Sequence, residues 1–267
     1  MNARAAALGA CTLALLTLLG GCAAPDVPSA SSSGPRTASE QTPADRRARV
    51  RLELAAAYFA RGQNSTALDE VKQALVARPD LAEAHSLQGL IYASLGENKL
   101  AEDSLQRALQ LNPRDADAMH NFGFFLCQQR RFAPAEAQFQ AALAVPQYSG
   151  AARTTLAQGI CQARAGQWAD ADRTLSRSYE LDPTSAVTAY NLSEVLLRRG
   201  ELQRARFYIQ RVNAVPEQVN AQSLWLAARI ERRLGDQAAL QVLARQLRDR
   251  FPQSPEALQL ERGRFDD

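Results

Sequence analysis

Apolar residues recur along this chain at a short spacing of three or four residues, and the whole pattern repeats about every 34 residues. Within each unit they lie three or four positions apart, as on one face of a helix, and do not alternate as in a strand. The small residue inside each predicted first helix marks the longer period. These marks are Ala55, Gly89, Gly123, Gly159, Ser193 and Ala227. Successive marks are 34 residues apart, except for a gap of 36 before Gly159.

Each mark is followed twelve residues later by an alanine in a second predicted helix. These alanines are Ala67, Ala101, Ala135, Ala171, Ala205 and Ala239. Small residues such as Gly89 and Ala101 let the two helices approach closely, while larger ones fill the contact with the next pair. Glycines such as Gly96 end the first helices and prolines such as Pro113 end the second, because glycine tolerates unusual backbone angles and proline cannot continue a helix.

This order of small residues and helix breakers resembles the tetratricopeptide repeat. The resemblance covers residues 48–252 and implies an all-α fold, a right-handed superhelical solenoid of about six repeats of paired antiparallel helices. Solenoids of this kind present extended surfaces to other proteins, and one fold serves many unrelated partners. The repeat therefore predicts a protein-binding scaffold without naming its partner.

The N-terminus predicts export and lipid attachment. Arg4 precedes an apolar run through Leu19, too short for a lasting membrane span. The Leu-Gly-Gly-Cys sequence ending at Cys22 resembles the lipobox of bacterial lipoproteins. It implies a signal peptide over residues 1–21 and acylation of Cys22; the alternative is an ordinary secretory signal with an incidental cysteine. By the same resemblance, the residue after the cysteine is Ala23 and not an aspartate, which implies transport to the outer membrane. The chain is then expected to be anchored there by its acyl chains and to face the periplasm.

The segments that flank the repeats differ from them in composition. Residues 22–47 are rich in proline, serine and alanine and cannot bury a core, which predicts a lipidated flexible tether. Residues 253–267 are assigned to a C-terminal tail. The formal net charge of +3 gives no electrostatic reason to expect a nucleic-acid partner.

Two cysteines remain after Cys11 is removed with the signal peptide and Cys22 is used for lipid. Cys127 and Cys161 lie in the first helices of the third and fourth repeats, on the same side as the marks. Export to an oxidising compartment favours a disulfide between them. The alternative is a pair of buried thiols that act as small hydrophobic residues.

The sequence offers little catalytic or metal-binding chemistry. Its only two histidines are His85, expected in the core, and His120, and no metal-ligand or nucleophile motif is present. Acidic residues such as Asp172 and Glu136 are interpreted as parts of solvated helix faces. The sequence therefore predicts no enzyme, no cofactor and no small-molecule substrate.

Partner binding is then expected on the concave groove of the predicted solenoid. In tetratricopeptide proteins a fixed set of first-helix positions lines the concave surface. The resemblance maps a predicted partner-binding groove onto Leu52, Ala56, Phe59, Leu90, His120, Phe124 and Tyr190. Its first part is apolar, which favours an amphipathic helix or a hydrophobic segment of a partner. For Leu52 and Leu90 a place in the core is an equally good explanation.

Three stretches carry a narrower resemblance. Asn121–Cys127, Gly159–Cys161 and Ala48–Tyr58 are similar to the third, fourth and first repeats of the type IV pilus biogenesis lipoprotein family called PilF or PilW. The resemblance implies a pilotin, which binds the type IV pilus secretin subunit and promotes its outer-membrane localisation and multimerisation. The alternative is another periplasmic lipoprotein adaptor, serving outer-membrane protein assembly or peptidoglycan enzymes.

Overall fold

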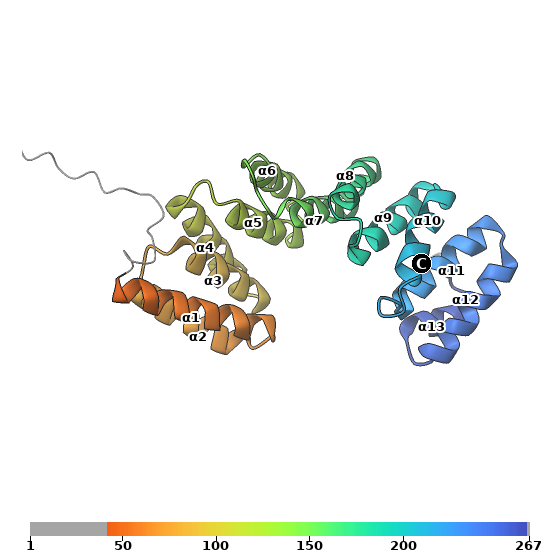
Figure 1. Ribbon diagram of the computed structural model, residues 1–267, viewed down its shortest axis with the longest axis horizontal. Helices are drawn as coiled ribbons and strands as arrows, with labels where there is room; N and C mark the ends of the chain where they lie inside the picture. Colours follow the sequence, from red (N-terminus) through yellow and green to blue (C-terminus); the bar gives the residue numbers. More distant parts are fainter. Residues whose placement is uncertain (1–41, 266–267) are drawn as a thin grey trace, which may run out of the picture. The chain divides into compact units, whose positions relative to one another are not determined.

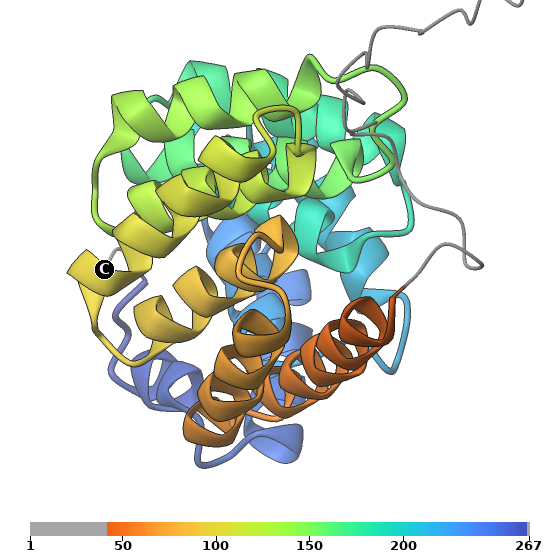
Figure 2. The same cartoon turned by 90° about the vertical axis from the view of Figure 1, so that its left-hand side faces the viewer.

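The computed structural model describes residues 42–265, and this part of the chain consists of thirteen α-helices with no strand. Twelve of the helices form six consecutive pairs, and each pair packs against the next along the chain (Figures 1 and 2). The predicted all-α tetratricopeptide solenoid is confirmed. The predicted signal peptide, the lipidation site Cys22 and most of the predicted tether lie outside the described residues. Among the described helices, none is long and apolar enough to cross a bilayer.

The two helices of a pair alternate along the chain. The first helices are α1 (Pro43–Ala60), α3 (Ala82–Ser94), α5 (Ala116–Gln128), α7 (Ala151–Arg164), α9 (Ala186–Arg199) and α11 (Ala221–Leu234). The second helices are α2 (Asn64–Ala77), α4 (Asn98–Leu111), α6 (Phe132–Leu143), α8 (Trp168–Leu181), α10 (Leu202–Asn213) and α12 (Gln237–Arg250), and α13 (Pro255–Glu261) follows the last pair.

Each first helix crosses its second helix at the small residue that marks the repeat. A Cβ atom added to Gly89 would lie 2.5 Å from Cγ of Leu105, closer than van der Waals contact allows. In the fifth repeat Ser193 preserves the close approach, and its hydroxyl donates a 2.9 Å hydrogen bond to the carbonyl of Ala205. The predicted role of the small residues in helix pairing therefore has a direct steric basis.

The turn inside each repeat requires a left-handed backbone. Glycine meets this requirement in five repeats, with φ between 73° at Gly62 and 81° at Gly96. The third repeat instead places Arg130 there, at φ 58°. A residue with a Cβ atom pays about 1–2 kcal/mol for this conformation, which glycine adopts freely.

Both ends of the described solenoid differ from the predicted boundaries. Helix α1 begins at Pro43, so residues 43–47 belong to a helix and not to the tether. The cause is a capping box, in which Thr42 and Asp45 each accept a hydrogen bond from the other's backbone amide. The predicted tail, residues 253–267, contains α13, which packs against α11 and α12. This helix covers apolar surface that the last pair would otherwise expose.

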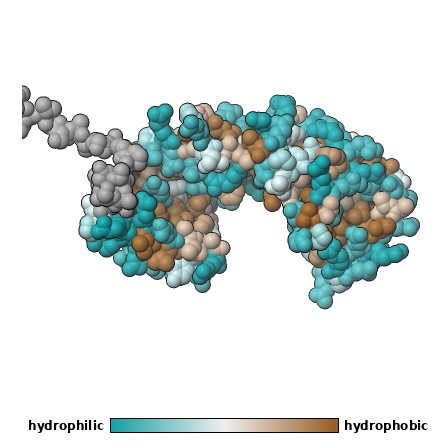
Figure 3. Space-filling model, viewed as in Figure 1, coloured by the Kyte–Doolittle hydropathy of each residue, from teal (hydrophilic) through white to brown (hydrophobic). Residues whose placement is uncertain are grey.

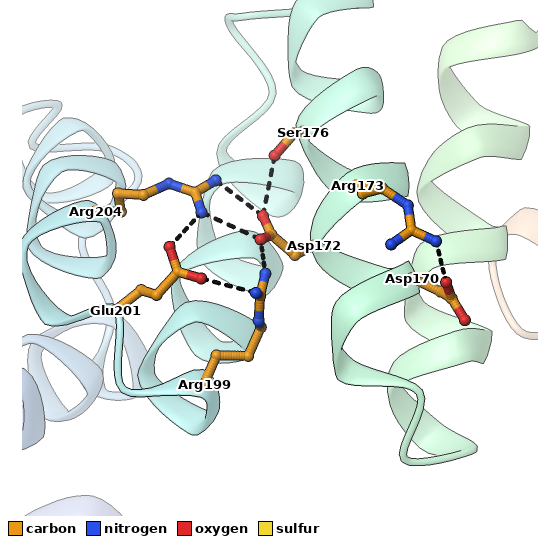
Figure 4. Close-up of polar contacts among 7 residues, drawn as sticks. All are labelled: Asp170, Asp172, Arg173, Ser176, Arg199, Glu201 and Arg204. Carbon is orange, nitrogen blue, oxygen red and sulfur yellow. Dashed lines mark hydrogen bonds and ion pairs between the residues drawn. The ribbon is translucent and has the colours of Figure 1, made fainter.

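Charged side chains join successive repeats, and Asp172 of α8 is the clearest case (Figure 4). Its buried carboxylate accepts hydrogen bonds from Arg199 at the end of α9, from Arg204 of α10 at 2.9 and 3.1 Å, and from Ser176 at 3.2 Å. Glu201 lies beside it and accepts 2.9 and 2.6 Å contacts from the same two arginines. The interpretation of Asp172 as part of a solvated face is wrong, because the next repeat covers it.

Two further sequence interpretations are corrected. Glu136 of α6 bonds to Gln158 and Gln162 of α7, at 2.6 and 3.3 Å, and so joins two repeats instead of standing in solvent. His85, expected in the core, is only half-buried, and its Nε2 lies 2.9 Å from the carbonyl oxygen of Pro79. A hydrogen bond to a local turn holds this ring at the edge of the helix pair.

Candidate protein-binding cleft

A cleft of about 410 Å³ opens across the first helices of the first three repeats, α1, α3 and α5. Its lining residues are Phe59, Leu90, Ala93, Ser94, His120, Asn121, Phe124, Phe125 and Gln128. The repeat period explains why they meet. Phe59 and Ala93 are 34 residues apart, as are Leu90 and Phe124, so each pair occupies equivalent places on neighbouring helices. Figure 3 shows apolar side chains exposed in the region of these repeats.

Three of the four polar side chains that line the cleft have hydrogen-bond partners within the protein, and one of them, Ser94, accepts its bond from Asn64 at 2.7 Å. The Nδ1 atom of His120 shares a 2.9 Å hydrogen bond with Oγ1 of Thr154, and Asn121 donates one of 3.0 Å to Ser86. Burial, reinforced by the positive charge of Arg153, lowers the pKa of His120 to about 4. The imidazole is therefore neutral near pH 7. An uncharged cleft with exposed aromatic carbon suits apolar side chains of a partner.

The structure brings four of the seven predicted groove residues together in this cleft: Phe59, Leu90, His120 and Phe124. The other three lie elsewhere. Leu52 is half-buried and packs against the core of the first repeats, as the core explanation required, whereas Leu90 lines the cleft. Ala56 is exposed but does not line the cleft.

Tyr190 lies on α9 and packs against the core of the later repeats. Burial, aided by the neighbouring Glu194 carboxylate, raises the pKa of Tyr190 to about 12. A phenol that is part of a packed core and far along the chain from the cleft is not part of it. Of the predicted groove, only the part in repeats one to three forms a cleft.

Ala93 also lies at a groove position of the repeat, and sequence reasoning missed the remaining four lining residues. Ser94 and Gln128 are 34 residues apart and directly follow groove positions, so the repeat period contained a signal for both. Asn121 and Phe125 occupy positions that usually face neighbouring helices. They reach the cleft because α3 and α5 are in contact along it. The periodicity of the sequence does not reveal this contact between two first helices.

Cys127 and Cys161 are joined by a disulfide between α5 and α7. Their Cα atoms are 5.8 Å apart, within the range that a disulfide spans, and both side chains are buried. The bond ties the third repeat to the fourth next to Gln128, which lines the cleft. It limits the relative movement of the two helices at the point where α5 carries Phe124.

Family profiles for the tetratricopeptide repeat match residues 52–116 and 116–145, which span the first three helix pairs. A comparison with curated protein sequences finds no match. Among solved structures the chain is similar to PilW, described as a widely conserved type IV pilus biogenesis factor. The TM-score is 0.75 and the identity 29%, over 80% of this chain and 98% of PilW.

Two further structures share the fold. PilF of Pseudomonas aeruginosa is 24% identical, with a TM-score of 0.72 over 83% of this chain and all of PilF. MamA of Desulfovibrio magneticus is 18% identical, with a TM-score of 0.54 over 65% of this chain and 97% of that one. The recognised resemblance to PilF and PilW therefore holds at the level of the whole solenoid.

Proposed function

We propose that this chain is a pilotin, a non-catalytic outer-membrane lipoprotein that binds the type IV pilus secretin subunit and promotes its localisation and multimerisation. The likeness to PilW extends over nearly the whole of that pilus biogenesis factor. The family-like stretches in the first, third and fourth repeats support the same role. They include Phe124 and Cys127, which lie at the cleft and at the disulfide beside it.

The observation that carries the proposal is the uncharged cleft of the first three repeats. Phe124 of α5 keeps 42% of its surface exposed although it lies in a cleft that three helices line. Phe59 and Leu90 stand beside it, and no carboxylate or guanidinium lines this cleft. Such a surface is suited to a hydrophobic or amphipathic helical segment of a partner, with apolar anchors one helical turn apart.

Membrane attachment is proposed to depend on Cys22, because the Leu-Gly-Gly-Cys sequence resembles a lipobox. Several acyl chains on one residue would give a durable anchor. Mass spectrometry of the mature protein should show a gain of about 0.8 kDa for three acyl chains beyond signal removal. A Cys22→Ala variant should lack this gain and leave the membrane fraction. Unmodified mature wild-type protein would refute lipidation.

The binding test uses Phe124→Ala with purified secretin subunit. A buried aromatic anchor contributes about 2 kcal/mol or more to an interface, so affinity should fall about thirtyfold. Phe207→Ala is the matched control, because Phe207 is also an exposed phenylalanine, at 49%, but lies on α10 outside the cleft. Phe59→Ala is harder to interpret, because Phe59 also packs against the core and its loss would change stability as well as binding. Equal affinity for the wild type and Phe124→Ala would remove the cleft from the interface.

A deletion strain tests the pilotin role itself. Loss of the gene should leave the secretin as monomers or in the inner membrane, and surface pili should be absent. Normal secretin multimers in the outer membrane of that strain would reject the pilotin role. Capture of outer-membrane assembly proteins or peptidoglycan enzymes by the wild type, lost in Phe124→Ala, would then favour the other adaptor function.

A further inference from the structure

A second recess, of about 340 Å³, lies beside the apolar cleft. It is lined by Cys127, Gln128, Arg130, Phe132 and Arg164. Gln128, the last residue of α5, lines both the recess and the cleft, so the two spaces adjoin at the end of that helix. One bound segment can therefore extend from the cleft into the recess.

Arg130 occupies a backbone position that disfavours it. At φ 58° it stands where the other five repeats have glycine, and a glycine would remove the strain. A strained residue persists where its side chain contributes something that the unstrained residue lacks. The contribution that the structure shows is a guanidinium in the recess.

The two arginine side chains of the recess are exposed to solvent, and no acidic residue lines the recess beside them. Neither Arg130 nor Arg164 forms an ion pair or a side-chain hydrogen bond within residues 42–265. Nearby arginines do: Arg131 bonds to Glu102 at 2.8 Å. Arg164 is also favoured by its place in the last turn of α7, where a cation meets the negative end of the helix dipole. Arg130 lies at the same end of α5, two residues beyond Gln128, so a helix dipole favours a cation there too, but it does not explain an arginine where five repeats have glycine.

We propose that this recess binds a carboxylate of the same segment whose apolar side chains fill the cleft. Guanidinium groups bind carboxylates with two parallel hydrogen bonds, and both arginines of this recess are open to such a ligand. The ligand is thus an amphipathic helix with an aspartate or glutamate just beyond its apolar face. The inference rests on the proposed protein-binding role of the cleft, but it does not require that the partner is the secretin.

The test uses three fluorescent amphipathic helical peptides that share one apolar face and carry glutamate, glutamine or lysine one turn beyond it. Binding to the whole chain is measured by fluorescence anisotropy at low and high salt. The glutamate peptide should bind about tenfold more tightly than the glutamine peptide, and the lysine peptide most weakly. The preference should shrink as salt is raised.

Arg130→Gly removes the guanidinium and the backbone strain together. Its thermal midpoint should be equal to or above that of the wild type, while the preference for glutamate falls several-fold. Gln147→Gly is the matched control, because Gln147 also has a positive φ, of 59°, but does not line the recess. This control should keep the full preference. Arg164→Glu leaves one positive and one negative charge in the recess, so the preference for glutamate should be lost.

Each alternative result has a definite meaning. Equal affinities of the glutamate and glutamine peptides for the wild type would overturn the carboxylate site but leave the apolar cleft. Failure of all three peptides to bind would reject an acidic amphipathic helix as the ligand. Binding to phosphatidylglycerol vesicles that is lost in Arg130→Gly, without a peptide preference, would assign the recess to lipid phosphate. A peptide preference together with no secretin binding would uphold this inference and reject the proposed partner.

Discussion

Replacing Asp172 by asparagine should destabilise the middle of the solenoid. The asparagine keeps the shape of the side chain but removes the charge that holds Arg199 and Arg204 across the contact between the fourth and fifth repeats. The carboxylate of Asp172 is 8% exposed, whereas the two arginine side chains are 30% and 44% exposed. After the substitution, water can therefore restore part of the lost solvation of both guanidinium groups.

These exposures set the expected size of the effect. Breaking a fully buried ion pair costs about 3–5 kcal/mol, and breaking an exposed one costs about 0.2–1 kcal/mol. Asp172 falls between these limits, so the free energy of unfolding should decrease by about 2–3 kcal/mol. Asp170→Asn is the control on the same helix. Asp170 pairs with Arg173 on an exposed face, and its loss should cost less than about 1 kcal/mol.

Urea unfolding followed by circular dichroism measures the overall change, and native hydrogen exchange locates it. Urea is preferred because a guanidinium salt would itself screen the ion pairs. Repeat proteins can unfold in parts, so amides of α8, α9 and α10 should lose protection before those of α1–α4. Equal stabilities of the Asp172→Asn and Asp170→Asn variants would refute the argument that burial gives this network its strength.

Three further outcomes are expected. The pKa of His120 is about 4 in the folded chain, so between pH 6.5 and 4 only the unfolded chain takes up a proton at this histidine. Over this range the free energy of unfolding should fall by up to about 3 kcal/mol more in the wild type than in His120→Asn. Parallel pH profiles of the two proteins would contradict this. Gly123→Ala should lower the thermal midpoint, since the new Cβ would lie 2.9 Å from the ring of Phe139; an unchanged midpoint would show that the helices adjust freely. Thiol labelling of denatured, unreduced protein should find Cys127 and Cys161 unreactive, and Cys127→Ser should cost about 3–4 kcal/mol through the 34-residue loop. Two labelled thiols would exclude the bond.

The repeat could be read directly from the sequence because its causes are local. A small residue is needed at every helix crossing and a left-handed residue, glycine in five of the six repeats, at every tight turn, so residues such as Gly89 and Gly96 return at a fixed spacing. The resemblance to tetratricopeptide proteins placed Phe59, Leu90 and Phe124 at groove positions, and the three residues line one cleft. These features depend on the contact of a helix with its nearest neighbours, which every repeat makes in the same way.

The sequence by itself thus determined the helix pairs, their order and the apolar character of the first groove. Only the tertiary structure decided that Leu52 belongs to the core and Leu90 to the cleft, that Asp172 is buried, and that Arg130 and Arg164 share one recess. Helical periodicity gives the direction of a side chain from its own helix. Whether that side chain meets water, a core or a counter-charge depends on how far the next repeat covers it, and this is fixed by contacts between residues about 30 positions apart.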